Sequence, residues 1–196
     1  TKTTLLYILN SDRRESVYVT KYLKKQIELY RPIIEQCVFE AGAMSPYLTA
    51  DEKVCLCQRW VKKHLKYLNE MLNYKKSEYW ANIDEIVKLL IDDCEGGAVL
   101  IWSMCVVAGV PEERIYIMVG TVKLQNTSKT KHCWVMYLSE NYQFVSFMID
   151  WCYYADLSDI PYKKAMMIDL STRQILYSGD TYLDFDFYSN SIDSYA

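Results

Sequence analysis

Apolar side chains recur at helical spacing in the first part of the chain, over residues 13–40. Pro32 lies inside this run, and a proline removes a backbone donor and clashes with the preceding turn of a helix. We therefore expect one kinked helix or a pair of helices here. The apolar positions that set the period are Val17, Ile27, Ile33, Ile34, Cys37 and Val38.

Two capping-box patterns open the next helices. Thr49, followed three residues later by Glu52, predicts the start of a second helix. Asn82 and Glu85 repeat the pattern and predict a shorter helix through Leu90. We expect the second helix to reach residue 72, because its apolar face consists of Val54, Val61, Leu65, Leu68 and Leu72.

A further apolar run predicts a helix that begins near Cys94 and ends at Gly109, because Val110-Pro111 cannot continue it. After it, the chain changes to segments rich in β-branched and aromatic residues, which are typical of strands. Helices first and strands afterwards indicate an α+β fold, with an antiparallel sheet that carries its helices on one side. The predicted strands are 115–122, 133–138 and 142–149, and 166–170 and 174–177 form a hairpin, whereas 179–196 show no period.

Composition narrows the class of protein. The 196 residues are 51% apolar, which suffices for the core of one domain. The net charge is -3 and the lysines and arginines are scattered, which argues against nucleic-acid binding. No apolar run is long enough for a membrane span and no signal peptide is seen, so we expect a soluble, cytoplasmic protein unless a leader preceded Thr1.

The seven cysteines are an odd number, and Cys55-x-Cys57 lacks the spacing of a zinc knuckle. We therefore expect most cysteines to be small buried residues in a reducing compartment. Cys94 is the exception, because it stands at the predicted start of an apolar helix, between Asp93 and Glu95. The partial positive charge of a helix N-terminus favours a thiolate there, and the free backbone N–H groups can bind an oxyanion.

A histidine and an acid follow this cysteine at the ends of predicted strands. His132 opens the strand that runs to residue 138, and Asp150 closes the next one. If the two strands pair, both side chains fall near the same end of a hairpin, where Asp150 can orient His132 and His132 can exchange a proton with Cys94. The other histidine, His64, lies on a lysine-rich helix and is expected to be a packing residue.

These residues resemble the transglutaminase-like superfamily of cysteine peptidases and acyltransferases, and in particular its bacterial and phage proteinase branch. The resemblance covers residues 79–152, with residues 1–78 as an added N-terminal helical region, 79–178 as the catalytic core and 179–196 as an aromatic and acidic tail. The matching residues are Tyr79-Trp80, Glu85, Asp93-Cys94-Glu95-Gly96, Ala98, Leu100, Gly109-Val110-Pro111, Gly120, His132-Cys133-Trp134-Val135 and Asp150.

The resemblance implies a papain-like core and an enzyme that acts on amide bonds of peptides or proteins. Cys94 would attack the carbonyl, His132 would exchange the proton and Asp150 would orient His132, with a thioester acyl-enzyme as intermediate. Trp80 would supply a second oxyanion donor through its indole N–H, beside the backbone N–H of Cys94. The alternative for Trp80 is a tryptophan that is packed under the helix.

Two departures from the family pattern concern the surroundings of the nucleophile. Gly96-Gly97 stands where many relatives have an acid and a bulky residue, and Cys133 replaces a common alanine. No cofactor is required, but the acids beside Cys94 raise its pKa unless something cationic neutralises them. Relatives of this branch use such acids to hold calcium, so Asp93 and Glu95 are candidate ligands. The alternative is that Asp93 caps the helix and Glu95 lies in its favourable first turn.

Two other functions compete with the enzyme. A structural or interaction protein that keeps the fold without catalysis, such as a viral assembly or virion component, would use the N-terminal helices or the C-terminal tail to bind a protein partner. Burial of Cys94 would favour that alternative, whereas a thiol within reach of His132 would favour catalysis. A metal module through His132, Cys133 and Cys152 lacks a fourth ligand.

Overall fold

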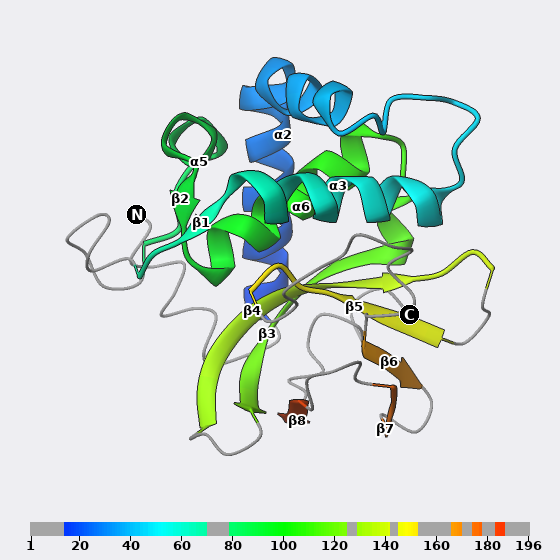
Figure 1. Cartoon of the computed structure of the whole chain (residues 1–196). Coiled ribbons are helices and arrows are strands. Elements are labelled where there is room, and N and C mark those ends of the chain that lie inside the picture. The colour runs from blue at the N-terminus through cyan, green and yellow to red at the C-terminus, as the bar shows by residue number, and fades with distance from the viewer. Residues whose placement is uncertain are drawn as a thin grey trace.

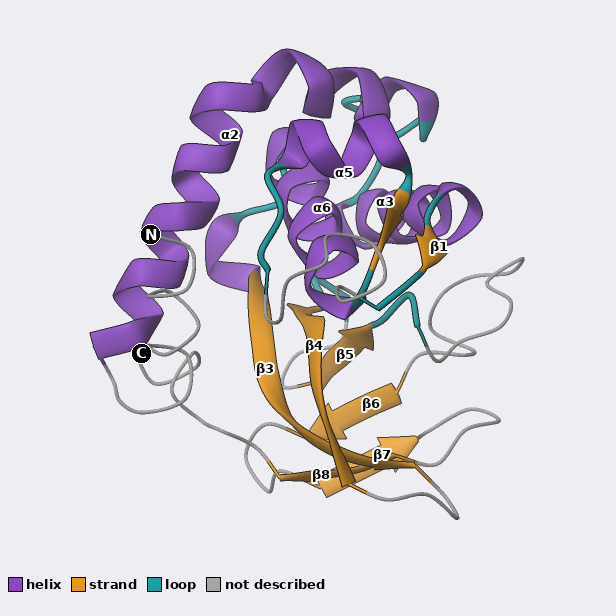
Figure 2. Cartoon of the chain, turned by 90° about the vertical axis from the view of Figure 1, so that its left-hand side faces the viewer, coloured by secondary structure: helices purple, strands orange, loops and turns teal. Residues whose placement is uncertain are grey.

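Helices and strands form two layers in the computed structural model. The helices gather on one side of the sheet in both orientations (Figures 1 and 2), which confirms the predicted α+β arrangement. None of the helices in the described part of the chain is both long enough and apolar enough to cross a bilayer. The structure describes residues 14–69, 79–124, 129–141, 145–152, 166–169, 174–177 and 183–186.

Helix α2 (Arg14–Glu40) is bent, as the proline predicts. Its backbone leaves the helical region at Tyr30, with φ of -122° and ψ of 19°, two residues before Pro32. The bend lets the helix follow the curved apolar core with both of its halves. The side chains that it buries include Leu23, Ile27, Ile34, Cys37 and Val38.

Helix α3 (Ala50–His64) has the predicted capping box. The amide of Glu52 donates to Thr49 Oγ1 at 3.2 Å, and the amide of Thr49 donates to Glu52 Oε2 at 2.8 Å. The expected continuation toward residue 72 is wrong. The chain leaves the helix after His64 and forms strand β1 (Lys66–Tyr67), which pairs in parallel with β2 (Ile91–Asp92). A pairing with a distant segment therefore overrides the local helical period, and position 72 itself lies outside the described residues.

Helix α5 (Ile83–Leu89) begins with the second predicted box, in which the amide of Asn82 donates to Glu85 Oε2 at 2.7 Å. Helix α6 (Cys94–Val107) follows β2 and ends as expected before Gly109, whose φ is +92°. This helix is buried along most of its length and contacts α2, α3, α5, β3 and β4. Its first residue is Cys94, so the packing of the whole helix layer positions the thiol.

One six-stranded antiparallel sheet forms the other layer, in the order β7-β6-β5-β4-β3-β8. The predicted hairpin of β6 and β7 is confirmed. Strand β8 lies in the segment for which no element was predicted and pairs with β3 at the sheet edge. After the short helix η1 (Glu112–Arg114), the strands are β3 (Ile115–Leu124), β4 (Lys129–Leu138), β5 (Val145–Ile149), β6 (Met166–Asp169), β7 (Gln174–Tyr177) and β8 (Leu183–Asp186).

A single hydrophobic core joins the two layers. It includes side chains of α2 and α3 as well as Cys94, Val135 and Ile149. The helices before residue 66 therefore pack into the same core as the helix and strands that carry the candidate site. They also reach that site directly, through hydrogen bonds from α3.

Candidate active site

Strands β4 and β5 bring His132 and Asp150 together. The two strands are antiparallel with Val135 opposite Ile149, so the start of β4 and the end of β5 meet at one end of the hairpin, as predicted. His132 Nε2 lies 2.6 Å from Asp150 Oδ2, and the two residues are 3% and 1% exposed. A buried carboxylate at this distance holds the orientation and tautomer of the imidazole ring.

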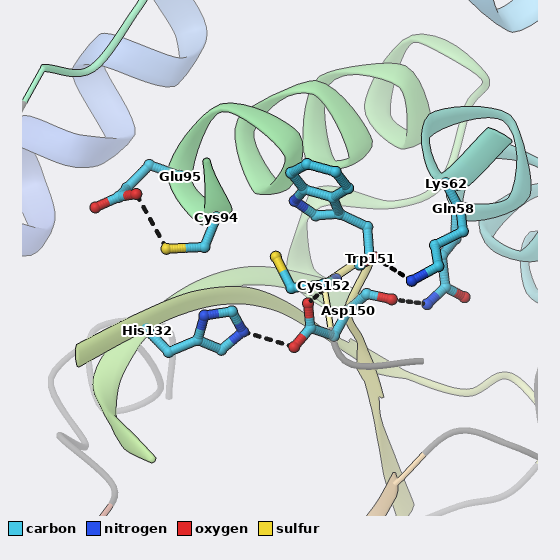
Figure 3. A network of polar contacts seen from close by, with 8 residues as sticks. All are labelled: Gln58, Lys62, Cys94, Glu95, His132, Asp150, Trp151 and Cys152. Carbon is cyan, nitrogen blue, oxygen red and sulfur yellow. Dashed lines mark hydrogen bonds and ion pairs between the residues drawn. The ribbon is translucent and has the colours of Figure 1, made fainter. Parts of the chain in front are cut away.

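The other ring nitrogen of His132, Nδ1, is turned toward Cys94 (Figure 3). Because Nε2 is engaged by Asp150, a proton from the thiol would be taken up at Nδ1. The carboxylate of Asp150 is itself held, since its Oδ1 accepts from the amide of Cys152 at 2.8 Å. Both carboxylate oxygens therefore have a defined partner.

Helix α3 holds the backbone of the segment that follows β5. Gln58 Nε2 donates to the carbonyl oxygen of Asp150 at 2.5 Å, and Lys62 Nζ donates to that of Trp151 at 2.5 Å. Burial lowers the pKa of Lys62, while the charge of Asp150 opposes that shift. The sequence did not indicate these two residues, because both lie in a helix outside the family motif and their partners are backbone atoms.

Cys94 lies at the start of α6, as expected, but the residue is only 9% exposed and its thiol donates to Glu95 Oε2 at 3.0 Å. Burial raises the pKa of Cys94, and the negative charges of Glu95 and Asp93 raise it further. These effects outweigh the helix terminus, so the thiol is neutral in this arrangement. Proton exchange with His132 requires the thiol to turn away from Glu95.

Asp93 is the N-cap of α6, as one of the two interpretations of this residue expected. Its Oδ1 accepts from the amide of Glu95 at 3.3 Å. One ligand atom from each of Asp93, Cys94 and Glu95 lies within 4.8 Å of the others, so capping leaves the two carboxylates close enough to share a cation. A second such group consists of His132, Asp150 and Cys152.

Steric crowding explains why residues 96 and 97 are both glycines. A Cβ atom at Gly96 would lie 2.2 Å from Asp92 Cγ, and one at Gly97 would lie 1.9 Å from Trp151 Nε1. The departure from the family pattern at these positions therefore makes room for a carboxylate and for an indole ring. Trp151 did not stand out in the sequence, because its only signal is that it directly follows Asp150.

Trp80 and His64 are both packing residues in this structure. Trp80 is 1% exposed and meets the ring of Tyr22 edge to face, with ring centres 5.8 Å apart. Its role as an oxyanion donor stays a prediction. His64 stacks on Trp60 at 4.3 Å, and its Nδ1 lies 2.7 Å from the carbonyl oxygen of Trp60, which agrees with the packing role expected for it.

Comparisons with known proteins place the fold. No model of a protein family matches the sequence, and no curated protein is similar to it in sequence. Among solved structures, calcium-bound LapG of Legionella pneumophila is similar at a TM-score of 0.50 and 12% identity, over 82% of this chain and 83% of LapG. A second LapG structure has a TM-score of 0.48 at 12% identity, over 91% of each chain. The chain therefore has the papain-like, transglutaminase-like fold that the motif implied.

Proposed function

We propose that the protein is a transglutaminase-like cysteine peptidase or acyltransferase that acts on peptide or protein amide bonds. The observation that carries the proposal is the buried pair of His132 and Asp150, with the second imidazole nitrogen turned toward a cysteine at a helix N-terminus. The likeness to LapG supports the fold on which such a site is built. The proposed substrates are proteins or peptides. The proposed catalytic triad consists of Cys94, His132 and Asp150.

The proposed reaction has two steps, acylation and deacylation of Cys94, and His132 transfers a proton in both. His132 Nδ1 takes the proton of the Cys94 thiol, and the sulfur attacks the amide carbonyl carbon while the carbonyl π electrons move to oxygen. When the intermediate collapses, the C–N bond breaks and the amine leaves with the proton from His132, which gives a thioester. Water or an amine, deprotonated by His132, then attacks the thioester carbon, the C–S bond breaks as the acid or the new amide is released, and His132 returns the proton to the sulfur.

The alkylation of Cys94 by iodoacetamide tests this proposal. We expect the rate at pH 7 to fall about 10-fold to 100-fold in His132→Ala, because the buried thiol loses the base that takes its proton. The rate is followed from pH 5 to 9, and mass spectrometry identifies the labelled cysteine. His64→Ala is the matched control and should alkylate as wild type does. Equal rates in all three proteins would contradict the proposal.

A second function is favoured by the burial of Cys94 and by its hydrogen bond to Glu95. Both would be found in a protein that keeps the fold and binds a partner without catalysis. The alkylation experiment separates the two functions, because the alkylation rate of a thiol without a catalytic role would not depend on His132.

The acids beside the thiol give a further prediction. Glu95→Gln is expected to lower the pKa of Cys94 and to raise its alkylation rate at pH 7 about three- to tenfold, because a negative charge that opposes the thiolate is removed. Stopped-flow alkylation measures the rate, and Glu113→Gln, on η1, is the control. An unchanged rate would mean that the charge of Glu95 does not raise the pKa of Cys94.

Calcium is the proposed ion for these acids. Asp93 and Glu95 offer carboxylate oxygens, which calcium prefers, and a bound ion would neutralise the charges that raise the pKa of Cys94. Added calcium should therefore speed the alkylation of the wild type but leave Glu95→Gln unaffected. Calorimetry that detects no calcium binding to the wild type would remove this part of the proposal.

A further inference from the structure

The indole N–H of Trp151 is buried without a hydrogen-bond partner among the described residues. The side chain is 4% exposed, and its Nε1 is one of seven buried side-chain polar atoms in the described part of the chain that have no hydrogen-bond partner. A buried tryptophan normally pairs its N–H, because leaving the group without an acceptor costs about 1–3 kcal/mol. The N–H of Trp151 is therefore open to an acceptor from another molecule, and its position decides whether such a molecule can reach it.

This donor lies on the helix face that carries the nucleophile. Trp151 Nε1 is so close to Gly97 that a Cβ atom there would be 1.9 Å away. Gly97 follows Cys94 by three residues, and positions three apart are neighbours on one face of a helix, with about 5–6 Å between their Cβ positions. The nitrogen edge of the indole ring is turned toward Cys94 (Figure 3).

The ring is also fixed in place, as a preorganised donor requires. Lys62 Nζ holds the carbonyl oxygen of Trp151, and Gln58 holds that of Asp150. Tyr67 packs against the indole, with ring centres 5.9 Å apart. Three contacts from α3 and β1 thus set the position of a side chain that directly follows the acid of the proposed triad.

We propose that Trp151 Nε1–H is the second donor of the oxyanion hole. This inference rests on the proposed function. When the Cys94 sulfur bonds to the carbonyl carbon, the displaced π pair leaves a negative charge on oxygen, which accepts hydrogen bonds from Trp151 Nε1 and from the backbone N–H of Cys94. As the first residue of α6, Cys94 has no acceptor for that N–H within the helix. Collapse of the intermediate returns the pair to the C=O bond and releases the donors.

Trp151 takes the role that the family pattern suggested for Trp80. Both indole nitrogens are buried without a partner in the described part of the chain. Trp80, however, directs its ring against Tyr22 of α2, whereas Trp151 contacts the first turn of α6. The two assignments can therefore be separated by experiment.

The test compares two reactions of the same thiol. Acylation of Cys94 by p-nitrophenyl acetate passes through an oxyanion, whereas alkylation by iodoacetamide does not. We expect Trp151→Phe to slow acylation about 100-fold while alkylation changes by less than about twofold, because only the first reaction uses the N–H. Trp60→Phe, which removes another buried and unpartnered indole N–H on α3, is the matched control and should change neither rate.

Each other outcome has a defined meaning. A loss of acylation in Trp80→Phe but not in Trp151→Phe would overturn the inference in favour of Trp80. An equal loss of both reactions in Trp151→Phe would show a structural role and would also overturn it. If p-nitrophenyl acetate did not acylate Cys94 of the wild type at all, the proposed function itself would fail.

A spectroscopic measurement adds a readout that does not rely on reaction rates. In nitrogen-15 spectra, acetylation of Cys94 should shift the indole N–H signal that is absent from Trp151→Phe and still present in Trp80→Phe, because the thioester oxygen then occupies the oxyanion hole. The same reagent should shift no indole signal in Cys94→Ala. Acetylated wild type without such a shift would overturn the inference.

Discussion

Replacing Asp51 by alanine is expected to lower the free energy of unfolding by about 3 kcal/mol, because several donors would lose one shared acceptor. Asp51 is 2% exposed. Its Oδ1 accepts from the Tyr137 hydroxyl at 2.6 Å and from the amide of Glu140 at 3.1 Å. Its Oδ2 accepts from Ser139 Oγ at 2.9 Å and from Asn141 Nδ2 at 2.6 Å. Urea unfolding measures the loss, and the slope with denaturant should stay unchanged.

Tyr137→Phe is the matched comparison for this prediction. It removes one donor and leaves the Asp51 carboxylate with its other partners, so a loss of about 1 kcal/mol is expected. A value for Asp51→Ala no larger than that of Tyr137→Phe would mean that water replaces the carboxylate without cost, and that the cluster does not hold the hairpin.

Asp51, Gln58 and Lys62 all lie on helix α3, and their hydrogen bonds hold the sheet in place from the same helix. Asp51 lies at the start of α3 and accepts hydrogen bonds from residues 139–141, which follow β4. Gln58 and Lys62 lie in the second half of the same helix and hold the backbone of residues 150–151. Helix α3 thus holds the residues at the end of β4 and those that follow β5, and the position of Asp150 depends on a segment that the family motif does not include.

Local signals in the sequence predicted the starts of helices well. Thr49 and Asn82 form the capping boxes that their spacing indicates, and Asp93 caps α6. A capping box needs only four consecutive residues, so it can be recognised without knowledge of the rest of the fold. The alternating apolar pattern of β4 and β5 likewise sufficed to bring His132 and Asp150 to one end of a hairpin.

Features that depend on distant segments could not be predicted in this way. The end of α3 is set by the pairing of residues 66–67 with 91–92, and β8 is set by its pairing with β3. In the site, the residue types around Cys94 indicated opposing effects on its pKa, but only the burial of the thiol decides the direction. No motif or spacing in the sequence identifies Trp151, because its proposed role depends on its contact with Gly97 in the folded chain.

The contact between Gly97 and Trp151 predicts a second large effect on stability. Gly97→Ala is expected to lower the free energy of unfolding by about 1–3 kcal/mol and to displace Trp151. In an open helix the same change would stabilise the fold by up to about 1 kcal/mol, because alanine has the higher helix propensity. Here the added methyl group would lie 1.9 Å from the indole nitrogen and 2.2 Å from Cε2. The ring cannot retreat easily, because its backbone is tied to Lys62.

A double-mutant cycle identifies the cause. Trp151→Ala removes the ring, so Gly97→Ala in that background should become neutral or stabilising by up to about 1 kcal/mol. Chemical unfolding of the four proteins gives the coupling energy between the two positions. If Gly97→Ala destabilised both backgrounds equally, the glycine would be needed for the backbone of α6 and not for the indole. A reversal of sign would show that residue 97 is a glycine because the face of Trp151 occupies the place of its side chain, which keeps the indole N–H beside Cys94.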